Sequence, residues 1–152
     1  MRVRGVVLGL LIAAIAAPAH ASNPSPCSLA SAADVKAAFG GTVGKGRVDT
    51  TTPDPTCHYS VKHSNLGRSG EAVVFASPEQ TAATFKIAKK YVPGAVTVTG
   101  IATAAFYNPH TTAIELLKGN SVANAQGIFF GANAAKIKAD VVVLAKAVAK
   151  HV

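Results

Sequence analysis

The chain has 152 residues, of which 49% are hydrophobic and only 14% charged, a composition that excludes a disordered tail and fits one compact domain. Lys and Arg total 15 against 7 Asp and Glu, so the chain is basic. It contains no Trp and two Cys, which excludes a cysteine-rich zinc or iron–sulfur module and a scaffold built on several disulfides.

Residues 1–21 have the pattern of a secretory signal peptide. Two arginines precede an apolar run over 5–17, and an Ala-His-Ala cleavage motif ends at Ala21. We expect cleavage after Ala21, which leaves a single domain over 22–152 that is secreted, periplasmic or held at the cell envelope. The alternative is an uncleaved anchor, but the apolar run is shorter than the roughly 20 residues that a transmembrane helix needs. No later stretch is long and apolar enough to span a membrane.

The two cysteines, Cys27 and Cys57, follow the cleavage motif. In an oxidising compartment two thiols of a small domain usually pair, so we predict a Cys27–Cys57 disulfide. The alternative is a redox-active pair, but the spacing lacks the Cys-x-x-Cys arrangement that lowers a thiol pKa. A structural disulfide is therefore predicted.

A short helix is predicted after the first cysteine. Ser31-Ala32-Ala33-Asp34 has the spacing of a capping box, with Asp in place of the usual Glu or Gln. Gly40-Gly41 provides the left-handed stop that commonly ends a helix. We expect Leu29, Val35 and Phe39 to face the core.

Three strands are predicted next. Residues 42–49 mix β-branched and polar side chains as an edge strand does, a turn covers 50–55, and strands follow over 56–63 and 71–76. In the second strand, alternation places His58 on one face, and on the core-facing side it places Cys57, Tyr59, Val61 and His63.

A second helix is predicted from Ser77-Pro78-Glu79-Gln80 to about Tyr91. Ser77 would be the N-cap, Pro78 the first helical residue, and Gln80 the side chain that reaches back to the cap. Lysines occupy its closing turns, where positive charge suits the helix dipole.

The second half of the chain predicts a meander and a final helix. Strands are expected over 95–99, 102–107, 113–118 and 121–128, the last two joined through Gly119-Asn120. In the closing helix over 134–150, one face is formed by Ile137, Val141, Leu144 and Val148. The predicted fold is α+β, with a mostly antiparallel sheet and three helices in the order α-βββ-α-ββββ-α. The two helix-plus-strands halves hint at a duplication.

Several motifs resemble those of small exported actinobacterial proteins and lipoproteins of unknown function. They are Cys27-Ser28-Leu29 before the capped helix, Thr56-Cys57-His58-Tyr59 at a strand start, and the later Ala104-Ala105-Phe106-Tyr107-Asn108 and Glu115-Leu116-Leu117-Lys118-Gly119-Asn120. The resemblance implies a compact α+β extracytoplasmic domain held by one disulfide, and it supplies no catalytic residues. Unlike the lipoproteins, the chain has no cysteine directly after the cleavage motif.

Histidines and one acid are the candidate site residues. His58 and His63 lie five residues apart on one predicted strand and so point to opposite faces, whereas zinc needs three or four converging ligands. We therefore expect no metal and no other cofactor. Glu115 is the one acid inside a strand pattern. The candidate ligand-binding residues are His58, His63 and Glu115, and an enzyme that uses His58 or His63 with Glu115 remains an alternative function.

Lysines offer another alternative. They gather at the end of the second helix and on the polar side of the last one: Lys86, Lys89, Lys90, Lys136, Lys138, Lys146 and Lys150. These faces could bind anions, although aromatic residues for base stacking are few and specific nucleic-acid binding is not expected. Small residues along the later strands permit close helix packing or an apolar cleft, and close packing is favoured.

No nucleophile elbow, phosphate loop or paired carboxylates appear in the sequence. We therefore predict a non-enzymatic secreted protein, acting as a monomer, that binds an unidentified protein partner or small ligand at the cell envelope.

Overall fold

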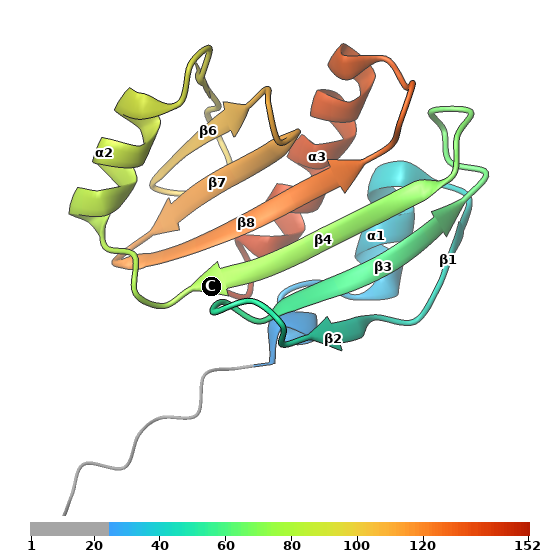
Figure 1. The fold of residues 1–152 in the computed structure, drawn as a ribbon, viewed down its shortest axis with the longest axis horizontal. Coiled ribbons are helices and arrows are strands. Elements are labelled where there is room, and N and C mark those ends of the chain that lie inside the picture. The colour runs from blue at the N-terminus through green and yellow to red at the C-terminus, as the bar shows by residue number, and fades with distance from the viewer. Residues whose placement is uncertain (1–24) are drawn as a thin grey trace, which may run out of the picture.

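A computed structural model describes residues 25–152, so the predicted signal peptide lies outside the described residues. The fold is α+β, as predicted: helices pack on an antiparallel sheet (Figure 1). After a short 3-10 turn η1 (Pro26–Ser28), the first half contains α1 (Ala32–Phe39), β1 (Thr42–Val43), β2 (Arg47–Asp49), β3 (Thr56–Lys62) and β4 (Gly70–Ser77). The second half contains α2 (Ala82–Tyr91), β5 (Val96–Thr97), β6 (Ala104–Asn108), β7 (Ala113–Lys118), β8 (Ser121–Ile128) and α3 (Ala134–Val148).

The sheet joins the two halves of the chain through their last strands. Its order is β1-β3-β4-β8-β7-β6-β5, with β2 also paired to β3, and every pairing is antiparallel. The central β4–β8 pair aligns Val74 with Ala125. None of the helices within residues 25–152 is long and apolar enough to cross a membrane.

Helices cover the two faces of the sheet unequally. α1 and α3 share one core with residues such as Tyr59, Val74 and Ala125, which alternate along their strands. α2 packs Phe85 against Phe106 and its neighbours in a separate small core on the opposite face. Figure 1 accordingly shows α1 and α3 together behind the sheet and α2 apart from them, near β6 and β7. Among residues 25–152, no helix packs on the opposite face of β3 and β4.

The predicted disulfide is present, and it connects η1 to β3. Cys27 and Cys57 are bonded, and Cys57 is fully buried. The capping box of α1 is also confirmed, since the Ser31 side chain accepts from the Asp34 N–H and the Asp34 carboxylate accepts from the Ser31 N–H. Leu29, Val35 and Phe39 are buried as expected.

The predicted edge strand over 42–49 is split into β1 and β2. Between them the backbone passes so close to β3 that a Cβ on Gly44 would lie 2.4 Å from the Ser60 Oγ, and one on Gly46 would lie 2.9 Å from the Cys57 Sγ. Glycine permits this approach but interrupts the ladder.

The prediction that His63 faces the core is wrong. β3 ends at Lys62, and His63 has a φ of +53°, which takes the chain out of the strand and leaves the side chain exposed. Cys57, Tyr59 and Val61 are buried as predicted. The alternation therefore holds until the backbone turns.

The predicted N-cap of α2 is also wrong. Ser77 is the last residue of β4, paired with Val122, and the helix begins at Ala82, five residues later. Thr81 is the N-cap, and its hydroxyl accepts from the Thr84 N–H while the Thr84 hydroxyl oxygen accepts from the Thr81 N–H. Strand pairing has therefore overridden the local capping pattern.

The final strands and helix agree closely with the sequence. β7 and β8 have the predicted bounds, and α3 buries Ile137, Val141, Leu144 and Val148. The small residues of β8 allow close helix packing, because a Cβ on Gly127 would lie 3.0 Å from both Phe39 and Val141. The interior is closely packed at this position.

Candidate functional site

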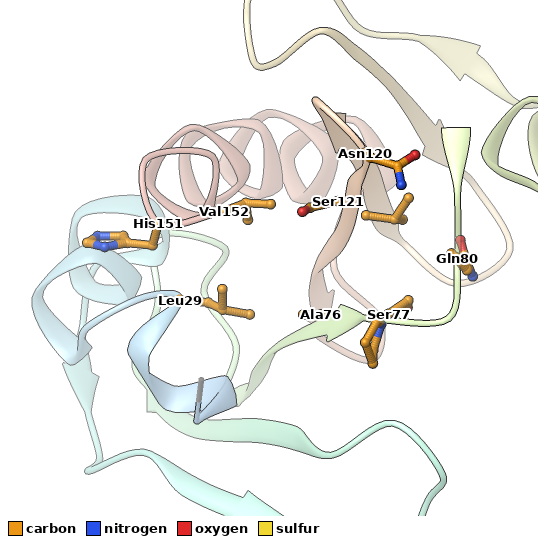
Figure 2. A pocket seen from close by; sticks show the side chains of 10 residues that line it. Leu29, Ala76, Ser77, Gln80, Asn120, Ser121, His151 and Val152 are labelled. Carbon is orange, nitrogen blue, oxygen red and sulfur yellow. The ribbon is translucent and has the colours of Figure 1, made fainter. Parts of the chain in front are cut away.

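A pocket of about 210 Å³ lies at the end of the sheet where β4 stops and β8 starts. In Figure 2, Leu29, His151 and Val152 line one side of it, and Ser77, Gln80 and Asn120 line the other. The remaining lining residues are Ala76, Pro78, Ser121 and Val122. Four separate chain segments thus enclose a mainly apolar space with a few polar groups, which is the usual composition of a small-molecule site.

The two polar side chains that matter most follow β4 directly. The Ser77 Oγ and the Gln80 Oε1 are buried and have no hydrogen-bond partner within residues 25–152. The turn between them is closed by the backbone, where the Gln80 N–H donates to the Ser77 carbonyl over 3.0 Å. Buried polar atoms in proteins are nearly always paired with protein or water, so the two oxygens at this pocket are available to water or to a bound molecule.

The opposite wall is held by the end of α3. The His151 N–H donates to the Val148 carbonyl over 2.9 Å, which keeps the last residues in a turn. The Lys118 Nζ donates to the Ala149 carbonyl over 2.8 Å and so fastens this turn to β7. Leu29, 2% exposed, completes the wall from the segment tied down by the disulfide. The pocket is therefore built on fixed elements.

A second group of polar residues surrounds His58 on the face of β3 opposite to α1 and α3. The His58 Nδ1 lies 2.9 Å from the Glu71 Oε1, and its Nε2 lies 2.8 Å from the Thr56 Oγ1. Because a carboxylate only accepts, the ring donates from Nδ1 when neutral, and Nε2 then accepts from the Thr56 hydroxyl. The result is a hydroxyl–imidazole–carboxylate chain.

Charged residues surround the hydrogen-bonded side chains of Thr56, His58 and Glu71. Lys45, Arg47, Ser60, His58 and Glu71 line a hollow of about 200 Å³. Asp49 is close as well: hydrogen bonds from Thr51 are the main cause that lowers the pKa of Asp49, with smaller contributions from the charges of His58 and Arg47. Acidic and basic groups are balanced here, so the hollow has no strong preference for anions.

Glu115 lies on the same sheet face but away from His58. It pairs in register with Asn124 of β8, so strands β8 and β4 separate it from β3. Its Oε1 is buried without a partner within the described residues, and burial raises the pKa of this carboxyl. His63 is exposed in the β3–β4 loop. The structure thus brings none of His58, His63 and Glu115 into contact with another of the three.

No group of three His, Cys, Asp or Glu side chains in the described part of the chain could hold a metal ion. No protein family, curated protein or solved structure matches this chain. The site is therefore interpreted from its own geometry.

Sequence reasoning missed the pocket residues and Glu71. Ser77 and Gln80 were interpreted as a helix cap, a role that would have used both side chains. Glu71 stands at the start of its strand, and its contact with His58 depends on the pairing of Ser60 with Glu71. No local pattern encodes that register, although a hairpin drawn between the two predicted strands would have placed both residues on one face.

Proposed function

We propose that the protein is an exported, non-enzymatic domain that binds a small ligand in the strand-end pocket at the cell envelope. The proposal depends chiefly on one observation, the unpartnered Ser77 Oγ and Gln80 Oε1 in a mainly apolar pocket. The signal-like sequence of residues 1–21 and the Cys27–Cys57 disulfide support the extracytoplasmic location.

The pocket suggests the chemistry of the ligand. Leu29, Ala76 and Val122 provide apolar walls, the Gln80 Oε1 accepts a hydrogen bond, and the Ser77 hydroxyl can donate or accept one. Its volume of about 210 Å³ is below the range usual for drug-sized ligands, so it fits a small molecule or one end of a longer molecule. We expect an apolar body that carries a hydroxyl or amide donor.

Matched probes test this proposal. 2-Naphthol has an apolar body and one hydroxyl, and naphthalene lacks the hydroxyl. We expect fluorescence titration to show binding of 2-naphthol roughly two- to tenfold tighter than naphthalene, the usual effect of one neutral hydrogen bond. Ser77→Ala combined with Gln80→Leu should remove this preference.

A filling variant tests the location. Ser121→Phe places a large side chain at the pocket mouth and should abolish binding of both probes, whereas Ser69→Phe, at an exposed position in the β3–β4 loop, should leave binding unchanged. If Ser121→Phe binds 2-naphthol as the wild type does, the ligand site is elsewhere. If neither probe binds the wild type, the proposed ligand chemistry is wrong.

A second candidate function is hydrolysis, favoured by the hydroxyl–imidazole–carboxylate chain of Thr56, His58 and Glu71. His58 would take the Thr56 proton as that hydroxyl attacks an ester carbonyl, and would return it to the leaving alcohol before water releases the acyl group. Hydrolysis of p-nitrophenyl acetate that is lost in Thr56→Ala and kept in Thr56→Ser would support this function. Equal rates for the wild type and Thr56→Ala would refute it.

A further inference from the structure

The outer side of α2 forms an exposed surface that is both apolar and basic. It consists of Lys86, Ile87, Lys89, Lys90 and Tyr91, and is called the α2 surface below. We infer that the α2 surface binds the headgroup region of an anionic lipid bilayer. This inference is independent of the proposed ligand pocket, which lies at the end of β4.

The α2 surface exposes apolar side chains that are not needed to pack α2 on the sheet. α2 already fixes itself to the sheet through Phe85, which is 2% exposed and contacts Phe106 at a ring-centroid distance of 5.3 Å. Yet Ile87 is 56% exposed and Tyr91 74%. Ile87 and Tyr91 stand four residues apart and so share one side of the helix. They present an apolar stripe to solvent.

The basic part borders this stripe. Lys86 and Lys90 are also four residues apart, and the Lys90 Nζ lies 5.9 Å from the centre of the Tyr91 ring. The Lys89 Nζ donates to the Thr97 Oγ1 over 2.7 Å, which ties α2 to β5. α2 contains no acidic residue, and within residues 25–152 no carboxylate forms an ion pair with these lysines. Their charge is therefore free to meet an external anion.

The combination favours a bilayer over a charged polymer. A nucleic acid or polysaccharide would neutralise the lysines but leave Ile87 in water, whereas a bilayer accepts charged and apolar side chains at different depths. Tyr91 suits the boundary because its ring is apolar and its hydroxyl polar. α2 also stands apart from α1 and α3 (Figure 1), so a flat surface can approach it.

Vesicle sedimentation of the chain without residues 1–21, in about 0.15 M salt, tests the inference. We expect binding to vesicles of phosphatidylglycerol and phosphatidylcholine in equal parts, and at least tenfold weaker binding to phosphatidylcholine alone. Ile87→Ser with Tyr91→Ser, and separately Lys86→Gln with Lys90→Gln, should each weaken binding to the anionic vesicles by roughly tenfold. All these side chains are exposed, and circular dichroism checks that the variants are folded.

Two matched controls locate the effect. Phe130→Ser removes an apolar side chain that is 87% exposed but lies outside the α2 surface, and Lys136→Gln with Lys146→Gln removes two charges from α3. Both should bind within about twofold of the wild type. Ser121→Phe should also bind vesicles normally, which separates this inference from the ligand pocket.

Three results would overturn the inference. They are wild-type protein that does not sediment with anionic vesicles, an α3 control that loses as much binding as the α2 lysine variant, and Ile87→Ser with Tyr91→Ser that binds like the wild type. The last result, with equally strong binding to heparin, would assign the lysines to polyanions.

Discussion

The Cys27–Cys57 disulfide permits a quantitative prediction of stability. The bond joins residues 30 positions apart and connects η1 to β3, where Cys57 is fully buried. On the chain-entropy model, closing a loop of this length in the unfolded state stabilises the fold by about 3.6 kcal/mol. A domain of this size has a free energy of unfolding of roughly 5–15 kcal/mol, so reduction should remove a large fraction of it.

Urea unfolding with and without a phosphine reductant measures this contribution directly. With a slope of about 2 kcal/mol per molar, reduction should lower the urea midpoint by roughly 1.8 M. The slope itself should rise slightly, because the reduced unfolded chain is less constrained and exposes more surface. Cys27→Ala with Cys57→Ala is the control, since its midpoint should be close to that of the reduced wild type and unaffected by reductant.

The reasoning fails in either of two cases. If wild-type midpoints with and without reductant agree within about 0.5 M, the loop constraint does not stabilise the fold as the chain-entropy model requires. If the oxidised protein reacts with two equivalents of a thiol reagent before unfolding, the bond itself is absent.

Three further changes test single features of the fold. Thr81→Ala should cost about 1 kcal/mol in urea unfolding because it removes the N-cap of α2, whereas Ser77→Ala should show no such loss, and the reverse order would restore the Ser77 cap. Burial raises the pKa of Glu115, so the folded state binds this proton more tightly than the unfolded state and is penalised above the raised pKa. Glu115→Gln should therefore be more stable than the wild type at pH 7 by an amount on the order of 1 kcal/mol. Near pH 3 the two proteins should be equally stable, because the Glu115 carboxyl is then protonated in both the folded and the unfolded state. A Gln variant that is less stable than the wild type at pH 7 would contradict this. Gly127→Val should lower stability by about 1–3 kcal/mol because its side chain would overlap Phe39 and Val141, and an unchanged thermal midpoint would show that α1 and α3 can yield.

Hydrophobic periodicity correctly predicted α3, β7 and β8. The α3 spacing of Ile137, Val141 and Leu144 places a continuous stripe on one side of a helix, and all three residues are buried. β7 and β8 were predicted with correct bounds because apolar runs flank the tight turn at Gly119. In these segments the local pattern and the tertiary packing agree.

His63 shows where alternation ceases to be informative. The alternating pattern of the sequence predicts a strand that includes His63, but the backbone of His63 has a positive φ, which ends β3. The neighbouring Ser64 N–H instead donates to the Arg68 carbonyl over 3.1 Å and closes the loop. The end of a strand therefore depends on loop hydrogen bonds that composition alone did not indicate.

The polar partners of His58 required knowledge of the strand register. The Glu71 contact arises because β4 pairs with β3 so that Ser60 lies opposite Glu71. This pair is two residues along from the pair His58 and Val73, so all four side chains lie on the same face. A shift of one residue would send Glu71 to the other face. The sequence thus indicated His58 as a candidate but paired it with Glu115, from which β8 and β4 separate it.

The unused capping pattern and the unpartnered oxygens of the strand-end pocket have a common physical origin. Had α2 begun at Pro78, the Gln80 side chain would have bonded back to Ser77 and the Ser77 hydroxyl would have accepted from the helix. Pairing with Val122 keeps Ser77 in β4, so these side chains lose their helical partners while the Ser77 Oγ and the Gln80 Oε1 remain buried. Thr81 and Thr84 then cap the helix in their place. The two oxygens that the capping pattern would have used are thus left without a protein partner at the strand-end pocket, because β4 continues to Ser77.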